Sequence, residues 1–135
     1  NSLTDINSNF SALNTDKVEA TTTVTLTNKR ITPRITSATS YTTDTGTSLN
    51  CDTQDMFIVT AQAGAIKFNN PQGTPTDGQK LIISITGTGA IAITWGTSFE
   101  ASTVALPTTT VTTNRLDVGF IWNVATSKWR CVAVA

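Results

Sequence analysis

The residues that could perform catalysis in this chain are few and widely spaced. The sequence contains no histidine, which excludes Ser-His-Asp and Cys-His catalysis, His-ligated zinc and an imidazole pH switch. Among the nine acidic residues, Asp52 and Asp55 stand out as a close pair, and paired carboxylates can hydrolyse glycosides. They lie at the start of an expected strand, however, where solvated turn acids are common. The sequence therefore favours a protein that is not an enzyme.

The two cysteines, Cys51 and Cys131, lie far apart and form no Cys-x-x-Cys motif. A zinc site needs about four ligands, which is more than these two residues supply. We expect two free thiols packed within a sheet. The alternative is a disulfide that ties an early strand to the last strand.

A loop rich in turn-forming residues, NNPQGTPTDGQ at positions 69–79, leads directly into the alternating run KLIISITG. A phosphate-binding loop would require a helix after it, whereas this run predicts a strand. A calcium loop requires several oxygen ligands on a short segment, and Asp77 is the only acid between Asp55 and Glu100. The prolines, the glycines and the Asp77-Gly78 dipeptide instead predict turns. We expect no metal and no cofactor here.

Three aromatic residues are candidates for surface recognition: Tyr41, Trp122 and Trp129. Aromatic rings can stack on sugars, and the two tryptophans flank one expected turn, which would bring them close together. Packing in the core or at a subunit interface is the favoured interpretation of the tryptophans, because large aromatic side chains dominate such burial.

Composition and periodicity predict the elements that must position these residues. Apolar residues make up 39% of the chain and charged residues 13%, about half the usual charged share. Threonine, which favours strands, supplies roughly a fifth of the residues. The formal net charge is +0, so no nucleic-acid partner is expected. No apolar run reaches the ~20 residues of a membrane span. These features predict an all-β protein.

Short strands separated by turn signals are expected from about Ile35 onward. Residues 56–60 are apolar on both faces, as in a buried strand, and the run at 80–87 alternates between apolar and polar positions. The tripeptide Gly-Thr-Gly at 87–89 predicts a tight hairpin to a returning strand at 91–95.

The clearest apolar row belongs to the end of the chain. Alternate residues from Leu116 to Trp122 are apolar and predict one inward face. A turn at 123–128 then leads to a last strand at 129–134. Turn signals at this spacing predict a β-sandwich or jelly-roll-like domain over residues 35–135.

The beginning of the chain has a different periodicity. The large apolar residues are spaced alternately by three and four positions, the a/d pattern of a coiled coil: Leu3, Ile6, Phe10 and Leu13. Ser2 and Asp5 resemble a capping box at the start of this helix. A helix of about two heptads is marginal in water by itself. We expect partner chains to support it, and the alternative is a helix folded back on its own domain.

An extended arm follows the expected helix and completes an N-terminal region at 1–34. Val24 and Leu26 alternate with threonines, and we expect them to take part in oligomerisation or anchoring together with the helix. Lys29, Arg30 and Arg34 lie close together in the sequence. A solvated linker that meets opposite charges on a neighbouring protein is favoured over a basic patch.

Four segments of the chain carry a family resemblance: GTPTDGQKLIISI, ITWGTSF, LPTTTV and VGFIWNVATSKWRCVAVA. Together they resemble a β-sandwich module of tailed-bacteriophage virion structural proteins, which include tail fibres, head fibres and decoration proteins. The resemblance covers about residues 35–135. The preceding FSALNTDKVEATTTVTLTNKRIT is similar to helix-plus-arm segments of phage fibres. This chain departs from such modules at Cys51 and Cys131, where small or apolar residues are more usual.

The resemblance implies a virion location, a homotrimer, and contacts with other virion proteins of the capsid, portal or tail. It implies no catalytic motif. We therefore expect a trimeric fibre or appendage subunit on the tail or head, anchored by its N-terminal segment and displaying the β-sandwich. One alternative is a capsid decoration protein that stabilises the head. Another is a receptor-binding module that contacts host surface glycan.

Overall fold

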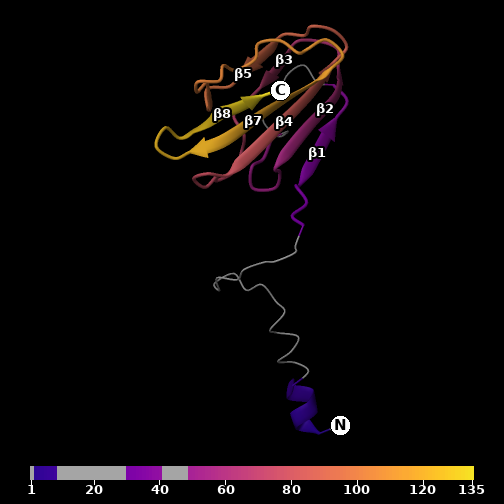
Figure 1. Ribbon diagram of the computed structural model, residues 1–135, viewed down its shortest axis with the longest axis vertical. Helices are drawn as coiled ribbons and strands as arrows, with labels where there is room; N and C mark the ends of the chain where they lie inside the picture. Colours follow the sequence, from indigo (N-terminus) through magenta and orange to yellow (C-terminus); the bar gives the residue numbers. More distant parts are fainter. Residues whose placement is uncertain (1, 9–29, 41–48) are drawn as a thin grey trace. The chain divides into compact units, whose positions relative to one another are not determined.

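The computed structural model describes residues 2–8, 30–40 and 49–135, and the chain forms two compact units, 1–31 and 32–135. In the first unit, residues 3–8 form a short helix. The second unit contains all the strands drawn in Figure 1. The described residues thus form an all-β protein with one short N-terminal helix, as the composition predicts. None of their helical segments has the length and apolarity that a membrane span requires.

The strands form one large and one small sheet (Figure 1). The large sheet has six strands, which in spatial order are β1 (Ile35–Ala38), β2 (Met56–Gln62), β4 (Lys80–Gly87), β7 (Arg115–Asn123), β8 (Lys128–Val134) and β6 (Phe99–Glu100). The small sheet pairs β3 (Ile66–Phe68) with β5 (Ile93–Trp95).

Four pairs of neighbouring strands run parallel. β1 is parallel to β2, β2 to β4, β6 to β8 and β3 to β5, whereas β7 is antiparallel to both β4 and β8. From β2 to β5 the chain alternates between the two sheets. Parallel strands need a crossover connection; β3 of the small sheet lies in the connection from β2 to β4, and β4 of the large sheet lies in the connection from β3 to β5.

The hairpin predicted between residues 80–87 and 91–95 is wrong. β4 pairs with β2 and β7, so both of its edges are occupied, and β5 pairs with β3. After Gly87 the Thr88 amide donates a hydrogen bond to the Gln62 carbonyl at 2.8 Å, and the chain crosses to the small sheet. The hairpin predicted at 123–128 is confirmed, because β7 and β8 pair antiparallel across it.

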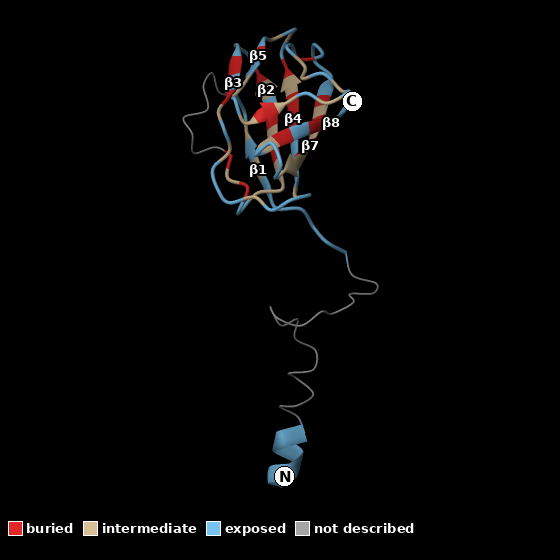
Figure 2. Ribbon diagram, turned by 90° about the vertical axis from the view of Figure 1, so that its left-hand side faces the viewer, coloured by how far each residue is buried: buried red, intermediate tan, exposed pale blue. Residues whose placement is uncertain are grey.

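The core lies between the inner face of the large sheet and the small sheet. The apolar row of β4 is confirmed, because Leu81, Ile83 and Ile85 are all buried (Figure 2). The ring of Trp95 in β5 joins the two sheets, since its centroid lies 5.4 Å from that of Phe120 in β7. Burial of each large apolar side chain contributes roughly 1.5–3 kcal/mol to the free energy of unfolding. This packing fixes which face of each strand remains outside.

Candidate functional site

The N-terminal helix exposes the apolar residues that its sequence pattern singles out. Leu3 is 79% exposed and Ile6 is 43% exposed. The predicted capping box is present, because the Asp5 amide donates to Ser2 Oγ at 3.3 Å and the Ser2 amide donates to Asp5 Oδ2 at 3.1 Å. These bonds satisfy orphan donors at the helix start. Four further residues of the predicted anchoring set lie outside the described residues: Phe10, Leu13, Val24 and Leu26.

The loop at 69–79 holds other loops in place, as its turn residues predict. Gly73 and Gly78 have positive φ angles of 107° and 78°, which glycine adopts without steric cost. Asp77 Oδ1 accepts a hydrogen bond from the Val124 amide at 3.0 Å. The Gly78 amide donates to the Trp122 carbonyl at 3.0 Å. Asp77 therefore fixes the β7–β8 turn. Within the described ranges, no group of three acids or cysteines that could hold a metal occurs.

Asp52 and Asp55 accept hydrogen bonds from different partners. Asp52 Oδ1 accepts from the Thr74 amide at 2.8 Å. Asp55 accepts from Arg34, whose Nη2 lies 2.7 Å from Oδ1. The hydrogen bonds from Arg34 lower the pKa of Asp55, which makes this carboxyl a poorer general acid at neutral pH. Arg34, one of the three basic residues of the predicted linker, is thus paired within its own chain.

Both cysteines are free and buried, and no disulfide joins them. The prediction of two free, packed thiols is confirmed. The Cys51 thiol donates to the Gln72 carbonyl at 3.0 Å. Burial raises the pKa of Cys51 and of Cys131. Because the thiolate is the reactive form, buried thiols of raised pKa are poor nucleophiles.

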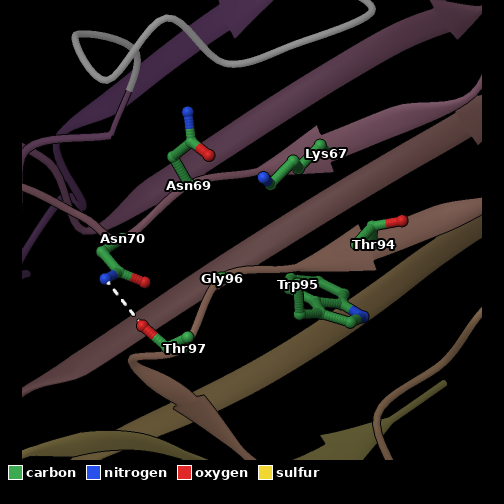
Figure 3. A pocket seen from close by; sticks show the side chains of 7 residues that line it. All are labelled: Lys67, Asn69, Asn70, Thr94, Trp95, Gly96 and Thr97. Carbon is green, nitrogen blue, oxygen red and sulfur yellow. Dashed lines mark hydrogen bonds between the residues drawn. The ribbon is translucent and has the colours of Figure 1, made fainter.

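An open hollow of about 500 Å³ lies on the small sheet. Figure 3 shows Lys67 and Thr94 side by side on β3 and β5, where they are paired in register. Asn70 Nδ2 donates to Thr97 Oγ1 at 3.1 Å, so this amide joins two loops. The Trp95 ring is half-buried and is packed against core aromatic rings. The hollow combines one lysine and the half-buried Trp95 with neutral polar groups, and its lining contains no acid and no thiol.

Of the three predicted aromatic recognition residues, one is buried in the core. Trp129 is only 1% exposed, so its role in surface recognition is wrong and its packing in the core is confirmed. Trp122 is half-buried, and its ring lies 5.3 Å from that of Trp129 in an edge-on arrangement. Such pairs stabilise a core beyond their buried area. Tyr41 lies outside the described residues.

The outer face of the large sheet is apolar where a solvent-facing sheet is usually polar. One row across five strands consists of residues paired in register: Ile35, Met56, Ile82, Gly119 and Ala133. We call this row, together with the adjacent Ile121 and Val132, the outer belt. Ile35 is 51% exposed, Ile82 40% and Val132 42%. Apolar residues thus run across five of the six strands, and the side chains of Ile35, Ile82 and Val132 are exposed.

A neutral polar network borders the outer belt on one side. Arg115 Nε donates to Asp117 Oδ1 at 2.8 Å, and Arg115 Nη2 donates to Ser84 Oγ at 2.8 Å. The Ser84 hydroxyl donates in turn to Asp117 Oδ1. Burial raises the pKa of Asp117, but the hydrogen bonds from Ser84 and Arg115 outweigh burial and lower it. The ionised carboxylate and the guanidinium therefore neutralise each other at the edge of the belt.

Cations border the belt on its other side. Lys80 and Arg130 flank Ile121 in register, and Glu100 on β6 is the register partner of Arg130. Neither cation forms an ion pair with any residue that the structure describes.

Sequence reasoning missed the outer belt because its members come from five separate strands. One signal was present, since residues 56–60 are apolar on both faces. That pattern indicated a strand buried on both sides, but in this chain the outward Met56 and Ile58 are only partly covered. The belt is the one extended apolar surface on the described part of the large sheet, and it suits contact with a protein better than chemistry on a small molecule.

No protein-family model matches the chain, and no curated protein or solved structure is similar to it at a significant level.

Proposed function

We propose that this chain is a structural protein of a tailed-bacteriophage virion, a subunit of a trimeric fibre or appendage on the tail or head. In this proposal the N-terminal segment joins the chains and anchors them to capsid, portal or tail proteins. Residues 32–135 form the displayed part, a β-sandwich module of the kind that the four segments quoted above resemble.

The observation that carries the proposal is the exposure of Leu3 and Ile6 in the helical segment 3–8. The a/d pattern spans only about two heptads, and a helix of that length is marginal by itself in water. Exposed apolar side chains at a/d spacing are stabilised when equivalent helices pack together. A helix of this kind therefore favours a protein that works as an assembly.

The polar groups of the 32–135 unit support a structural role. The carboxylates of Asp52, Asp55, Asp77 and Asp117 each accept hydrogen bonds that join loops or strands. Both thiols are buried. Carboxylates that are hydrogen-bonded to other segments, and thiols that are buried, favour a stiff structural module over a catalytic one.

Light scattering on the full chain at micromolar concentration tests the proposal. The expected mass is about three times the 14.3 kDa of one chain. Replacing Ile6 with serine should lower that mass, whereas replacing Asn7 with serine, an exposed polar position on the same helix, should leave it unchanged. A chain that stays monomeric, or an Ile6→Ser variant with unaltered mass, would count against N-terminal assembly.

A further inference from the structure

The chain from β2 to β5 consists of two successive units of the same plan. β2 leads into β3 and β4 leads into β5, so each unit places one strand in the large sheet and one in the small sheet (Figure 1). Equivalent strands of the two units are parallel neighbours. We infer that the units are coils of a tandem repeat, stacked as in a solenoid, and that the stack can be lengthened by further coils. The stacking goes beyond the proposed function, because it does not depend on a role in a virion.

The register of the strands shows a fixed period. Met56 pairs with Ile82 in the large sheet, at a separation of about 26 positions, which lies in the range of known repeat architectures. Ile66 pairs with Ile93 in the small sheet at nearly the same separation. Because the two separations agree, the second coil covers the first along both sheets at once. Strands that had been brought together independently would not need to share one period.

The two units are also similar in sequence. MFIVTAQAGAIKF at 56–68 corresponds to IISITGTGAIAITW at 82–95. Each segment begins with mostly apolar residues followed by threonine, continues through small and polar residues, and ends in alanine, isoleucine, a polar residue and an aromatic residue. The motif is short and its residue types are common, so the repeat becomes evident only when the register aligns the two units.

Equivalent residues of the two units have equivalent surroundings. The rings of Phe68 and Trp95 stack with their centroids 5.0 Å apart and an angle of 18° between their planes. Lys67 and Thr94 are both exposed on the outer side of the small sheet. Three further pairs are buried in the core: Phe57 with Ile83, Val59 with Ile85, and Ile66 with Ile93. Ladders of matching residues are expected where each repeat packs mainly on its neighbours.

The C-terminal side of the stack is capped, and the other side continues the parallel arrangement. After β5 the chain reverses, so that Thr109 forms an antiparallel bridge with Ala92, and β7 lies antiparallel to β4. Antiparallel segments cannot continue parallel coils, and atypical ends of this kind are usual in repeat proteins. Towards the N-terminus, β1 is parallel to β2 and Asn50 forms a parallel bridge with Gln72.

A stack of this kind can grow without a new core. A further unit between Leu81 and Ile82 would pair with β2 on one side and with β4 on the other, in the register that these strands already use with each other. Each added coil would widen both sheets by about 4.8 Å. The number of units would therefore determine the width of the module.

Insertion of one unit into the full chain tests the inference. One variant carries a second copy of residues 56–81 between Leu81 and Ile82, and another carries a second copy of residues 69–95 after Trp95. Both insertions preserve the period of the stack. The matched control carries residues 56–81 in scrambled order at the first position, so its length and composition are the same. Urea unfolding gives the m-value, the slope of the free energy of unfolding against urea, which rises with the surface buried on folding.

An insert that folds as a coil should raise the m-value by roughly a quarter, in proportion to the residues that it adds to the 32–135 unit. Its copy of Lys80 should then resist trypsin. An insert that loops out should leave the m-value unchanged and be cut within the insert, as we expect for the scrambled control. A higher m-value and protection in at least one in-register variant, with neither in the control, would support the repeat. Unchanged m-values or loss of cooperative unfolding in both variants would overturn it, as would a control that behaves like them.

Discussion

Two adjacent isoleucines on β4 should respond very differently to the same substitution. Ile83 faces the core and is 0% exposed, whereas Ile82 faces outward and is 40% exposed. Replacing isoleucine with alanine removes about three carbon groups, worth about 0.8 kcal/mol each when buried. Ile83→Ala also leaves a cavity, so we expect it to lower the free energy of unfolding by about 3–4 kcal/mol. Ile82 is only partly buried, so Ile82→Ala should lower the free energy of unfolding by the same transfer energy scaled to its buried fraction, about 1.4 kcal/mol.

Urea unfolding followed by tryptophan fluorescence measures both losses, because Trp95 and Trp129 are packed in the core. The comparison should be made at a dilution at which the wild-type chain is dissociated, so that only the contacts within one chain count. Equal losses for the two variants, or a larger loss for Ile82→Ala, would show that the two faces of β4 are wrongly assigned.

Two further predictions concern the loop ends and the polar network. Gly87→Ala should be strongly destabilising, by about 3 kcal/mol or more, because a Cβ there would lie 2.5 Å from Thr110 Oγ1 and 2.6 Å from a backbone oxygen; thermal unfolding checks this, and an unchanged midpoint would contradict the close approach. Asp117 has a pKa lowered by its partners, so the ionised form stabilises the fold above the unfolded pKa of about 3.9, and this stability is lost as the pH falls through the lower folded pKa. Asp117→Asn should therefore lower the free energy of unfolding at pH 7 by less than about 1 kcal/mol, since the Arg115–Asp117 ion pair is largely exposed. The urea midpoint of the variant should also change less between pH 7 and pH 3 than that of the wild type. If the two midpoints change equally, other carboxyls cause the acid sensitivity.

The alternation of side chains was a reliable guide to faces. The β4 row that the sequence predicts as inward is buried, and the β7 row is buried from Leu116 to Phe120 and half-buried at Trp122. A strand places successive side chains on opposite sides, so this property depends only on neighbours along the chain. Ser84 is the exception, because it lies on the outer face and is nevertheless fully buried. Arg115 and Asp117, which are distant in the sequence, cover it.

The partners of each strand could not be predicted in the same way. The Gly-Thr-Gly tripeptide at 87–89 has the composition of a hairpin, yet the chain crosses there to the other sheet. Pairing of β4 with β2 and β7 is a contact between distant segments, and the energy of such pairing exceeds local turn preference. The turn at 123–128 was predicted correctly because the two strands that it joins, β7 and β8, pair with each other.

By itself the sequence determined the all-β class, the capped N-terminal helix with its exposed apolar residues, and the buried rows of the strands. These are properties of composition and of short-range periodicity. Only the tertiary structure decided that Ile35, Met56, Ile82, Gly119 and Ala133 form one row, because each comes from a different strand. The physical reason is that a sheet is assembled by hydrogen bonds between segments that are far apart in the chain, and a surface across it exists only after that assembly.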